Sequence, residues 1–349
     1  MPIAELFGQQ EAIRKLDGEL LSGTLSHAYL MWGPAGGDRM QLAMALALAA
    51  NCSAREPRPG LWYCGECANC TKLLAGVHPD YTVVRPDGSV LKIGQILEMQ
   101  SRIALRPGES HLKTWVLDDA HAMNVEAQNC LLKTLEEPPG HALIILLADD
   151  PGMLLPTISS RCHSVRLGSV ERDALAEWGR RELGLSPERA AVLAAVSSGL
   201  RGRMERLAAE PAYFKVRNAI ISKARDVMWS GDGGKALAVS ESLLAALKRS
   251  SGGEADASET ASISTPQGAC DVLAGYMRDV LAASLGGGRD ALINVDMADE
   301  IFVDAERGGA EEFKRWAEKC MSTGEAIAAN ANTRLALDDL MLDLALPLT

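Results

Sequence analysis

The segment of residues 113–139 constrains the fold more than any other part of the sequence. It opens with the apolar run Trp115-Val116-Leu117, which ends at two adjacent carboxylates, Asp118 and Asp119. A short apolar run that ends at acidic residues is typical of a buried strand whose carboxyl edge presents oxygen ligands. Asn124 is a predicted helix N-cap, and the helix after it must end before the two prolines that close the segment. The segment therefore predicts an α/β protein with chemistry at a strand end.

A second strand, predicted over residues 28–32, runs directly into a glycine-rich loop and a long helix. This order is the context of a phosphate-binding loop, where backbone N–H groups and the helix N-terminus surround phosphate. The pattern G-x-x-x-x-G-K-[ST] requires Gly, Lys and Ser or Thr where this chain has Asp38, Arg39 and Met40. A carboxylate there repels a polyphosphate, and a thioether does not ligate Mg²⁺. We interpret the loop as one that keeps the backbone conformation of a P-loop but no longer supports nucleotide hydrolysis. The predicted degenerate nucleotide site comprises Gly33, Gly36, Gly37, Arg39, Asp118 and Asp119.

Half of the eight cysteines lie in one short stretch, with the spacing Cys52-x11-Cys64-x2-Cys67-x2-Cys70. Four thiolates at this spacing suit tetrahedral Zn²⁺ better than disulfides or a redox pair, which would need a thioredoxin-like context. A closed set of four thiolates leaves no open coordination position. The sequence therefore predicts a structural zinc site and no catalytic one.

Three further runs carry a resemblance to a known family. They are NCLLKTLEEPP at residues 129–139, ALIILLA at residues 142–148, and the segment from Pro156 to Cys162. Together they resemble bacterial DNA polymerase III clamp-loader subunits, which include a delta-prime type and a gamma/tau motor type. Both types belong to the AAA+ class of P-loop folds. The resemblance is strong over residues 1–210 and weaker over the remainder.

The resemblance implies a chain built of three parts, with an α/β P-loop fold at its start. The apolar share of 47% combined with only 4% aromatic residues independently favours a helix-rich protein with aliphatic packing. The expected parts are a RecA-like AAA+ domain over residues 1–165 with a zinc module inserted at 52–70, a helical lid over 166–209, and an all-α collar for oligomerisation over 210–349.

The resemblance also gives the run Ser160-Arg161-Cys162 a role. An arginine that follows a helix at a domain edge can enter a neighbour's active site and stabilise charge on a transferring phosphate. The match to the clamp-loader motif implies that Arg161 is such an arginine finger acting in trans. The alternative for an arginine in this place is an ordinary surface ion pair.

Other positions depart from the pattern of an active ATPase. The strand predicted over residues 142–148 ends at Asp149 and Asp150, where ATPase relatives offer a Thr or Asn to the γ-phosphate, and an acid there repels it. Active relatives also carry a nucleotide-sensing arginine in the lid. Alignment on the lid glycine puts that position at Gly202, although a shift of one residue would place it at Arg201 or Arg203.

Charge and hydropathy limit what the chain can bind and where in the cell it is expected. A net charge of −11 argues against a protein that binds nucleic acid without other subunits, because phosphate neutralisation needs clustered Lys and Arg. The longest uninterrupted apolar run, Leu42 to Ala50, is too short to span a bilayer. The first five residues do not have the order of a signal peptide. The expectation is a cytoplasmic protein that meets DNA only inside an assembly and has no membrane partner.

The function implied is that of a delta-prime-like clamp-loader subunit that does not hydrolyse ATP and holds neither ATP nor Mg²⁺ productively. Its expected partners are gamma/tau-like motor subunits, a delta-like subunit, the sliding clamp through the complex, and primed DNA within the assembly. One alternative is an active gamma/tau-type ATPase, with Arg39 as the P-loop cation and Asp118 holding Mg²⁺. A lesser alternative is a stand-alone zinc-dependent DNA-binding module.

Overall fold

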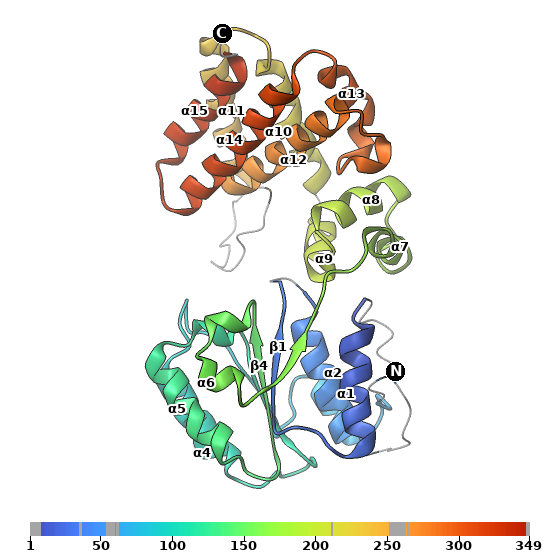
Figure 1. Ribbon diagram of the computed structural model, residues 1–349, viewed down its shortest axis with the longest axis vertical. Helices are drawn as coiled ribbons and strands as arrows, with labels where there is room; N and C mark the ends of the chain where they lie inside the picture. Colours follow the sequence, from blue (N-terminus) through green and yellow to red (C-terminus); the bar gives the residue numbers. More distant parts are fainter. Residues whose placement is uncertain are drawn as a thin grey trace. The chain divides into compact units, whose positions relative to one another are not determined.

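The computed structural model describes residues 8–34, 37–53, 60, 63–210, 212–250, 263 and 265–346 (Figure 1). The chain divides into two compact units, and each is described by itself. The first comprises Met1–Glu171 with Gly199–Arg203, and the second comprises Arg172–Ser198 with Met204–Thr349. The division into three parts expected from the sequence remains a prediction.

A parallel sheet of five strands forms the middle of the first unit. Its strands are, in spatial order, β2 (Tyr81–Val84), β3 (Lys113–Leu117), β4 (Ala142–Ala148), β1 (Ala28–Trp32) and β5 (His163–Arg166). All residues of β4 are buried, as expected for a central strand covered on both faces. Because β4 lies between β3 and β1, the carboxyl ends of these three strands lie side by side. The predicted α/β fold with a parallel sheet is confirmed.

Helices cover both faces of this sheet (Figure 1). The residues of β4 alternate between the two faces: Leu143 and Ile145 pack with α1 and α2, whereas Ile144 and Leu146 pack with α4, α5 and α6. The short 3-10 helices η1 and η2 follow β3 and β4. The bounds of these elements are α1 Gln10–Ser22, α2 Arg39–Asn51, α3 Ala68–Leu74, α4 Ile93–Ile103, η1 Ala120–Ala122, α5 Val125–Glu136, η2 Pro151–Met153 and α6 Pro156–Ser159.

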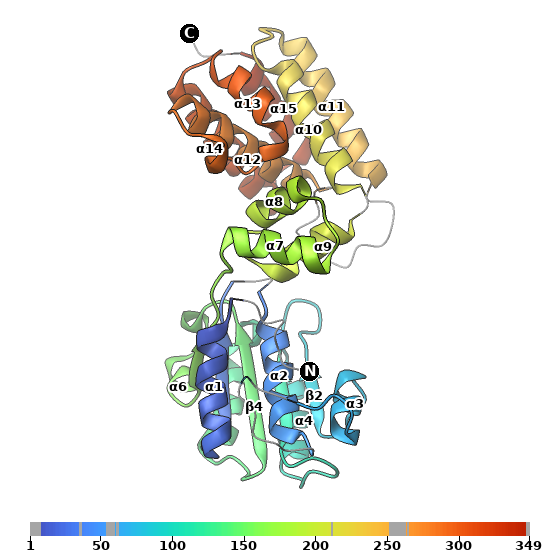
Figure 2. The ribbon, with the colours of Figure 1, turned by 90° about the vertical axis from the view of Figure 1, so that its right-hand side faces the viewer.

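The second unit is helical (Figure 2). Helix α12 packs along α14, where Phe313 and Trp316 are fully buried and Trp229 makes edge-to-face contact with both rings. Helix α9 begins in the first unit and continues in the second. The bounds are α7 Arg172–Glu182, α8 Pro187–Val196, α9 Arg201–Ala209, α10 Tyr213–Val227, α11 Gly233–Ser250, α12 Pro266–Ser284, η3 Arg289–Ala291, η4 Val295–Met297, α13 Ala298–Ala305, α14 Ala310–Ala328 and α15 Thr333–Ala345. Within the described ranges, no helix combines the length and the apolar character needed to cross a membrane.

Candidate functional site

The glycine-rich loop runs from the end of β1 to the N-terminus of α2. At Gly33, an added Cβ would lie 2.5 Å from the carbonyl oxygen of Leu167, so the close approach of the chain after β5 requires glycine there. The predicted site residue Gly36, with Ala35, lies outside the described residues. Gly37 donates its backbone N–H to the carbonyl oxygen of Pro34 at 3.1 Å, which closes a tight turn before the helix. The loop thus keeps the strand–turn–helix geometry predicted from its sequence.

Asp38, at the N-cap of α2, is engaged with an arginine of the first turn of α9. Its side chain does not cap the helix. Its Oδ1 instead accepts a hydrogen bond from Nε of Arg201 at 2.9 Å, and both side chains are almost fully buried. The carboxylate therefore carries a fixed negative charge at the helix N-terminus, where a phosphate would bind in a P-loop. Of the three residues considered for the lid sensor, the structure brings Arg201 to the loop.

Arg39 replaces the P-loop lysine and is held by acids from two other strand ends. Its Nη1 lies 2.6 Å from Oδ1 of Asp149, after β4, and its Nη2 lies 3.8 Å from Oδ1 of Asp119, after β3. Only 8% of Arg39 is exposed. Ligand atoms of Asp119, His121 and Asp149 lie within 4.8 Å of one another and could hold a cation. The guanidinium of Arg39 already supplies the positive charge at this group.

The remaining residues of the predicted nucleotide site do not complete it either. Burial and the adjacent charge of Asp119 raise the pKa of Asp118, and Arg85 Nε, 3.5 Å from Asp118 Oδ2, opposes this shift. Met40, at the position of the Mg²⁺-binding hydroxyl, packs against the apolar cluster under α1 and α2. Packing explains a methionine there, because a hard cation prefers oxygen ligands. Met40 therefore lacks the hydroxyl oxygen that a P-loop supplies to Mg²⁺ at this position.

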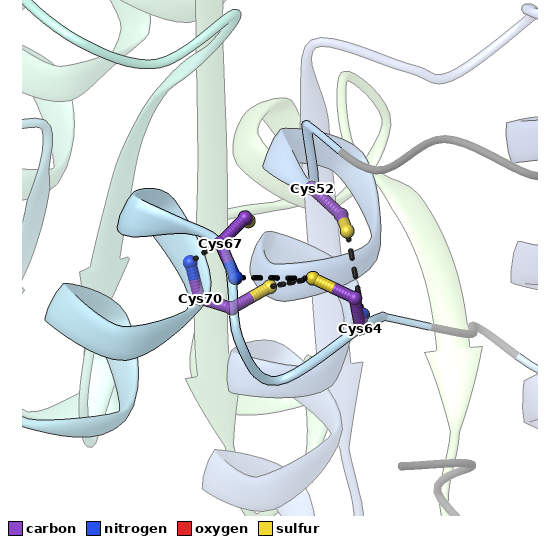
Figure 3. Close-up of side chains that lie close together, drawn as sticks. All are labelled: Cys52, Cys64, Cys67 and Cys70. Carbon is purple, nitrogen blue, oxygen red and sulfur yellow. Dashed lines mark hydrogen bonds between the residues drawn. The ribbon is translucent and has the colours of Figure 1, made fainter.

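The four cysteines of the predicted metal site lie together beside the end of α2 (Figure 3). Cys52 follows α2, Cys64 and Cys67 lie in the loop before α3, and Cys70 lies within α3. Their sulfur atoms all lie within 4.8 Å of one another. The predicted cluster of four cysteines is confirmed, and its donor set can hold one tetrahedral metal ion.

Backbone N–H groups point at the sulfur atoms of this cluster. The amide of Cys67 donates to Sγ of Cys64 at 3.2 Å, and the amide of Cys64 donates to Sγ of Cys52 at 3.4 Å. Burial opposes ionisation of Cys67, but the amides of Cys70 and Ser53 together with the thiols of Cys70 and Cys64 lower the pKa of its thiol to about 6. Burial raises the pKa of Cys70. Amides that favour thiolates are the usual surroundings of sulfur ligands.

The run Ser160-Arg161-Cys162 forms the turn between α6 and β5. Cys162 is buried in the cluster under α4 and α5, and Ser160 donates its Oγ–H to the carbonyl oxygen of Thr157 at 3.2 Å. Arg161 points away from the core, with 37% of its side chain exposed, and its Nη2 lies 2.8 Å from Oε1 of Glu136. Ser160 and Arg161 are both exposed, and Arg161 has the longer side chain with which to reach another molecule.

Comparison with known proteins shows which family the chain resembles. Residues 8–171 match the family described as DNA polymerase III, delta subunit. The chain is 27% identical to the DNA polymerase III subunit delta' of Bacillus subtilis over 96% of its own length and 95% of that protein. Over residues 8–171 the chain matches this family, and it resembles a delta' subunit along nearly its whole length. It is also 38% identical to subunit delta' of Pseudomonas aeruginosa, although that alignment covers only 47% of this chain and 50% of the relative.

Two other similarities accompany these matches. Over 49% of its length, the chain is 32% identical to DNA polymerase III subunit tau of Bacillus subtilis, of which it covers 30%. A gamma subunit-related protein of Thermotoga maritima, with 18% identity, superimposes on 97% of this chain and 98% of its own with a TM-score of 0.40. With a score this low, the fold is assigned from the strand order itself.

Sequence patterns alone did not reveal the partners of several charged residues in this chain. Asp149 was predicted to repel phosphate, but its ion pair with Arg39 was not foreseen. The contacts of Arg85 with Asp118 and of Glu136 with Arg161 were also missed. The only sequence signal for them was the placement of charged residues directly after buried strands or at a helix end, which does not specify partners.

Proposed function

We propose that this chain is a non-hydrolysing delta'-type subunit of the DNA polymerase III clamp loader. In this role, Arg161 is placed against ATP bound by a neighbouring gamma/tau-type subunit. Hydrolysis there is coupled to loading of the sliding clamp on primed DNA. A delta-like subunit completes the expected set of partners. This chain contacts the clamp and the DNA only as part of the assembly, in keeping with its net charge of −11. A cytoplasmic location follows from this role.

The ion pairs of the glycine-rich loop support the absence of hydrolysis. Arg39 is neutralised by Asp149, and Asp38 and Asp149 place negative charges where a nucleotide would place its phosphates. Two like charges 4 Å apart repel by about 4 kcal/mol at an effective dielectric constant of about 20. Because Arg201 and Arg39 compensate part of the charge of these acids, the repulsion that a phosphate meets is smaller than this value, and the larger effect is that Arg39 has less charge to offer a phosphate. Asp149 next to Arg39 is the single observation that carries the proposal most directly.

The arginine-finger role is supported by the geometry of the turn after α6. Cys162 anchors the turn in the core, while the guanidinium of Arg161 stays exposed to an incoming neighbour. A planar guanidinium can make two parallel hydrogen bonds to phosphate oxygens. These features suit delivery of charge to a phosphate on another subunit.

For the cysteine cluster we propose one structural zinc ion, held by Cys52, Cys64, Cys67 and Cys70. Zinc would supply a cross-link between the end of α2 and the start of α3. The apolar contacts of this region are few, comprising Leu48 and Leu73 with some half-buried neighbours. A metal cross-link offsets this small core.

Calorimetric titration of the full chain with a non-hydrolysable ATP analogue and Mg²⁺ is expected to show no binding at millimolar nucleotide. The reason is the acidic surroundings of Arg39 described above. The gamma/tau-type subunit of the same organism, titrated in parallel, is the positive control. Micromolar binding by this chain would contradict the proposal and favour the alternative of an active motor subunit.

Purified chain is expected to contain one zinc ion, and Cys67→Ser is expected to lose it. Metal content is measured by atomic emission and by mass spectrometry of the native chain. Loss of the metal should lower the melting temperature by roughly 5 to 10 °C, because about 3 kcal/mol of lost stability shifts a domain of this size by about 3 °C per kcal/mol. Cys130→Ser, outside the cluster, is the matched control. Equal zinc content in both variants would contradict the assignment.

A further inference from the structure

The guanidinium of Arg161 is held from the side of its own subunit by two contacts. Nη2 forms an ion pair with Oε1 of Glu136 at 2.8 Å, and Nη1 donates a hydrogen bond to the carbonyl oxygen of Thr157 at 3.0 Å. Glu136 is the last residue of α5, and Thr157 belongs to α6. The side chain therefore has one contact on each of the two helices that flank it.

Helices α5 and α6 are themselves fixed to each other near Arg161. The buried side chain of Gln128 accepts a hydrogen bond from the backbone N–H of Leu155 at 2.8 Å, at the start of α6. Leu135 of α5 and Ile158 of α6 are buried in the same apolar cluster. The carboxylate of Glu136 is thus presented to Arg161 by a rigid support.

The pair of Glu136 and Arg161 contributes little to the stability of the fold. About half of the Glu136 side chain and 37% of the Arg161 side chain are exposed, and ion pairs in water are weak. The pair has a larger effect on the order of the Arg161 side chain than on fold stability, because a free arginine side chain populates many rotamers and loses them when it is fixed in place. A group that is already oriented before the neighbour arrives avoids that loss in the transition state.

We propose that Glu136 is a positioning residue that orients Arg161 toward the ATP of the neighbouring subunit. This inference rests on the proposed arginine-finger function. Glu136 does not touch the phosphate itself and acts only through the guanidinium. Both contacts come from helices of the same subunit, and 37% of the Arg161 side chain is exposed, so the carboxylate can orient the side chain while part of it stays accessible to an incoming anion.

Full chain carrying Glu136→Ala, assembled with the gamma/tau-type and delta-type subunits of its own organism, is expected to lower kcat for ATP hydrolysis by about 10-fold. KM for ATP should stay unchanged, because the nucleotide is bound by the neighbour. Glu136→Gln keeps the length and an acceptor oxygen and should restore most of the rate. Glu137→Gln, the exposed adjacent acid, is the matched control and should leave kcat unchanged. All three variants should melt at the temperature of the unaltered chain.

A double-variant cycle separates this inference from the function on which it rests. Arg161→Ala should lower kcat, and adding Glu136→Ala to it should cause no further loss, because Glu136 acts only through Arg161. If Arg161→Ala has no effect, the proposed function fails. If Arg161→Ala lowers kcat but Glu136→Ala leaves it unchanged or raises it, the positioning role of Glu136 is overturned and the proposed function stands. A further loss in the double variant would also overturn it.

Discussion

Replacing Arg161 with alanine is expected to slow ATP hydrolysis at the neighbouring subunit's site by about 10³-fold or more, the range observed for arginine fingers. Charge develops on the phosphate oxygens during transfer, and a guanidinium is a strong stabiliser of that charge in a site closed to water. The structure leaves Arg161 exposed and supported by Glu136, so it can be delivered without rearrangement of the core. The measurement is single-turnover hydrolysis by the assembled complex, in which a loss at the site next to this chain appears as a slow phase beside the unaltered phases of other sites.

Two further variants define the cause of that loss. Arg161→Lys keeps the charge but lacks the planar fork, and we expect it to recover only part of the rate. Arg102→Ala removes an exposed arginine that pairs with Glu98 on α4, and it should leave hydrolysis unchanged. Equal rates for Arg161→Ala and the unaltered complex would show that Arg161 is an ordinary surface ion pair with Glu136. That was the alternative left open by its sequence.

Local patterns predicted the elements of the first unit well. The apolar run before Asp118 is β3, the helix after it begins at the predicted N-cap Asn124, and the side-chain oxygen of that residue accepts from the N–H of Ala127. The cysteine spacing likewise predicted a cluster, because three of its members lie in one tight turn and short helix. Such features depend on neighbours in the sequence, and sequence periodicity and spacing report them directly.

Partners of the charged residues depended on tertiary structure and were not predictable. Asp38 and Arg201 are 163 residues apart in the sequence, and only the folded chain brings them together. The sequence showed that Asp38, Arg39 and Met40 depart from the P-loop pattern, but not what those side chains do. The structure gives each a role: Asp38 pairs with Arg201, Arg39 pairs with Asp149, and the half-buried Met40 packs against the core. Substitutions that look like decay of a site are thus part of the packing and charge balance of the first unit.

Replacing Arg201 with methionine is expected to lower the free energy of unfolding by about 3 to 5 kcal/mol, as found when one partner of a buried ion pair is removed. The substitution leaves the carboxylate of Asp38, which is 1% exposed, without its arginine in a site from which water is excluded. The measurement is urea denaturation of the full chain followed by circular dichroism. Arg102→Ala, which breaks an exposed pair, should change the midpoint little.

The double variant Asp38→Asn with Arg201→Met tests whether charge is the cause of that loss. It removes the negative charge of Asp38 together with the positive charge of Arg201, and we expect it to regain most of the stability, since a buried ion pair and a neutral pair of similar size differ little in net free energy. If the double variant is as unstable as Arg201→Met alone, the arginine stabilises the loop by packing and not by charge. If Arg201→Met itself costs less than about 1 kcal/mol, water reaches Asp38 and the loop is open enough to admit an anion. In that case the absence of nucleotide binding would have to rest on Arg39 and Asp149 alone.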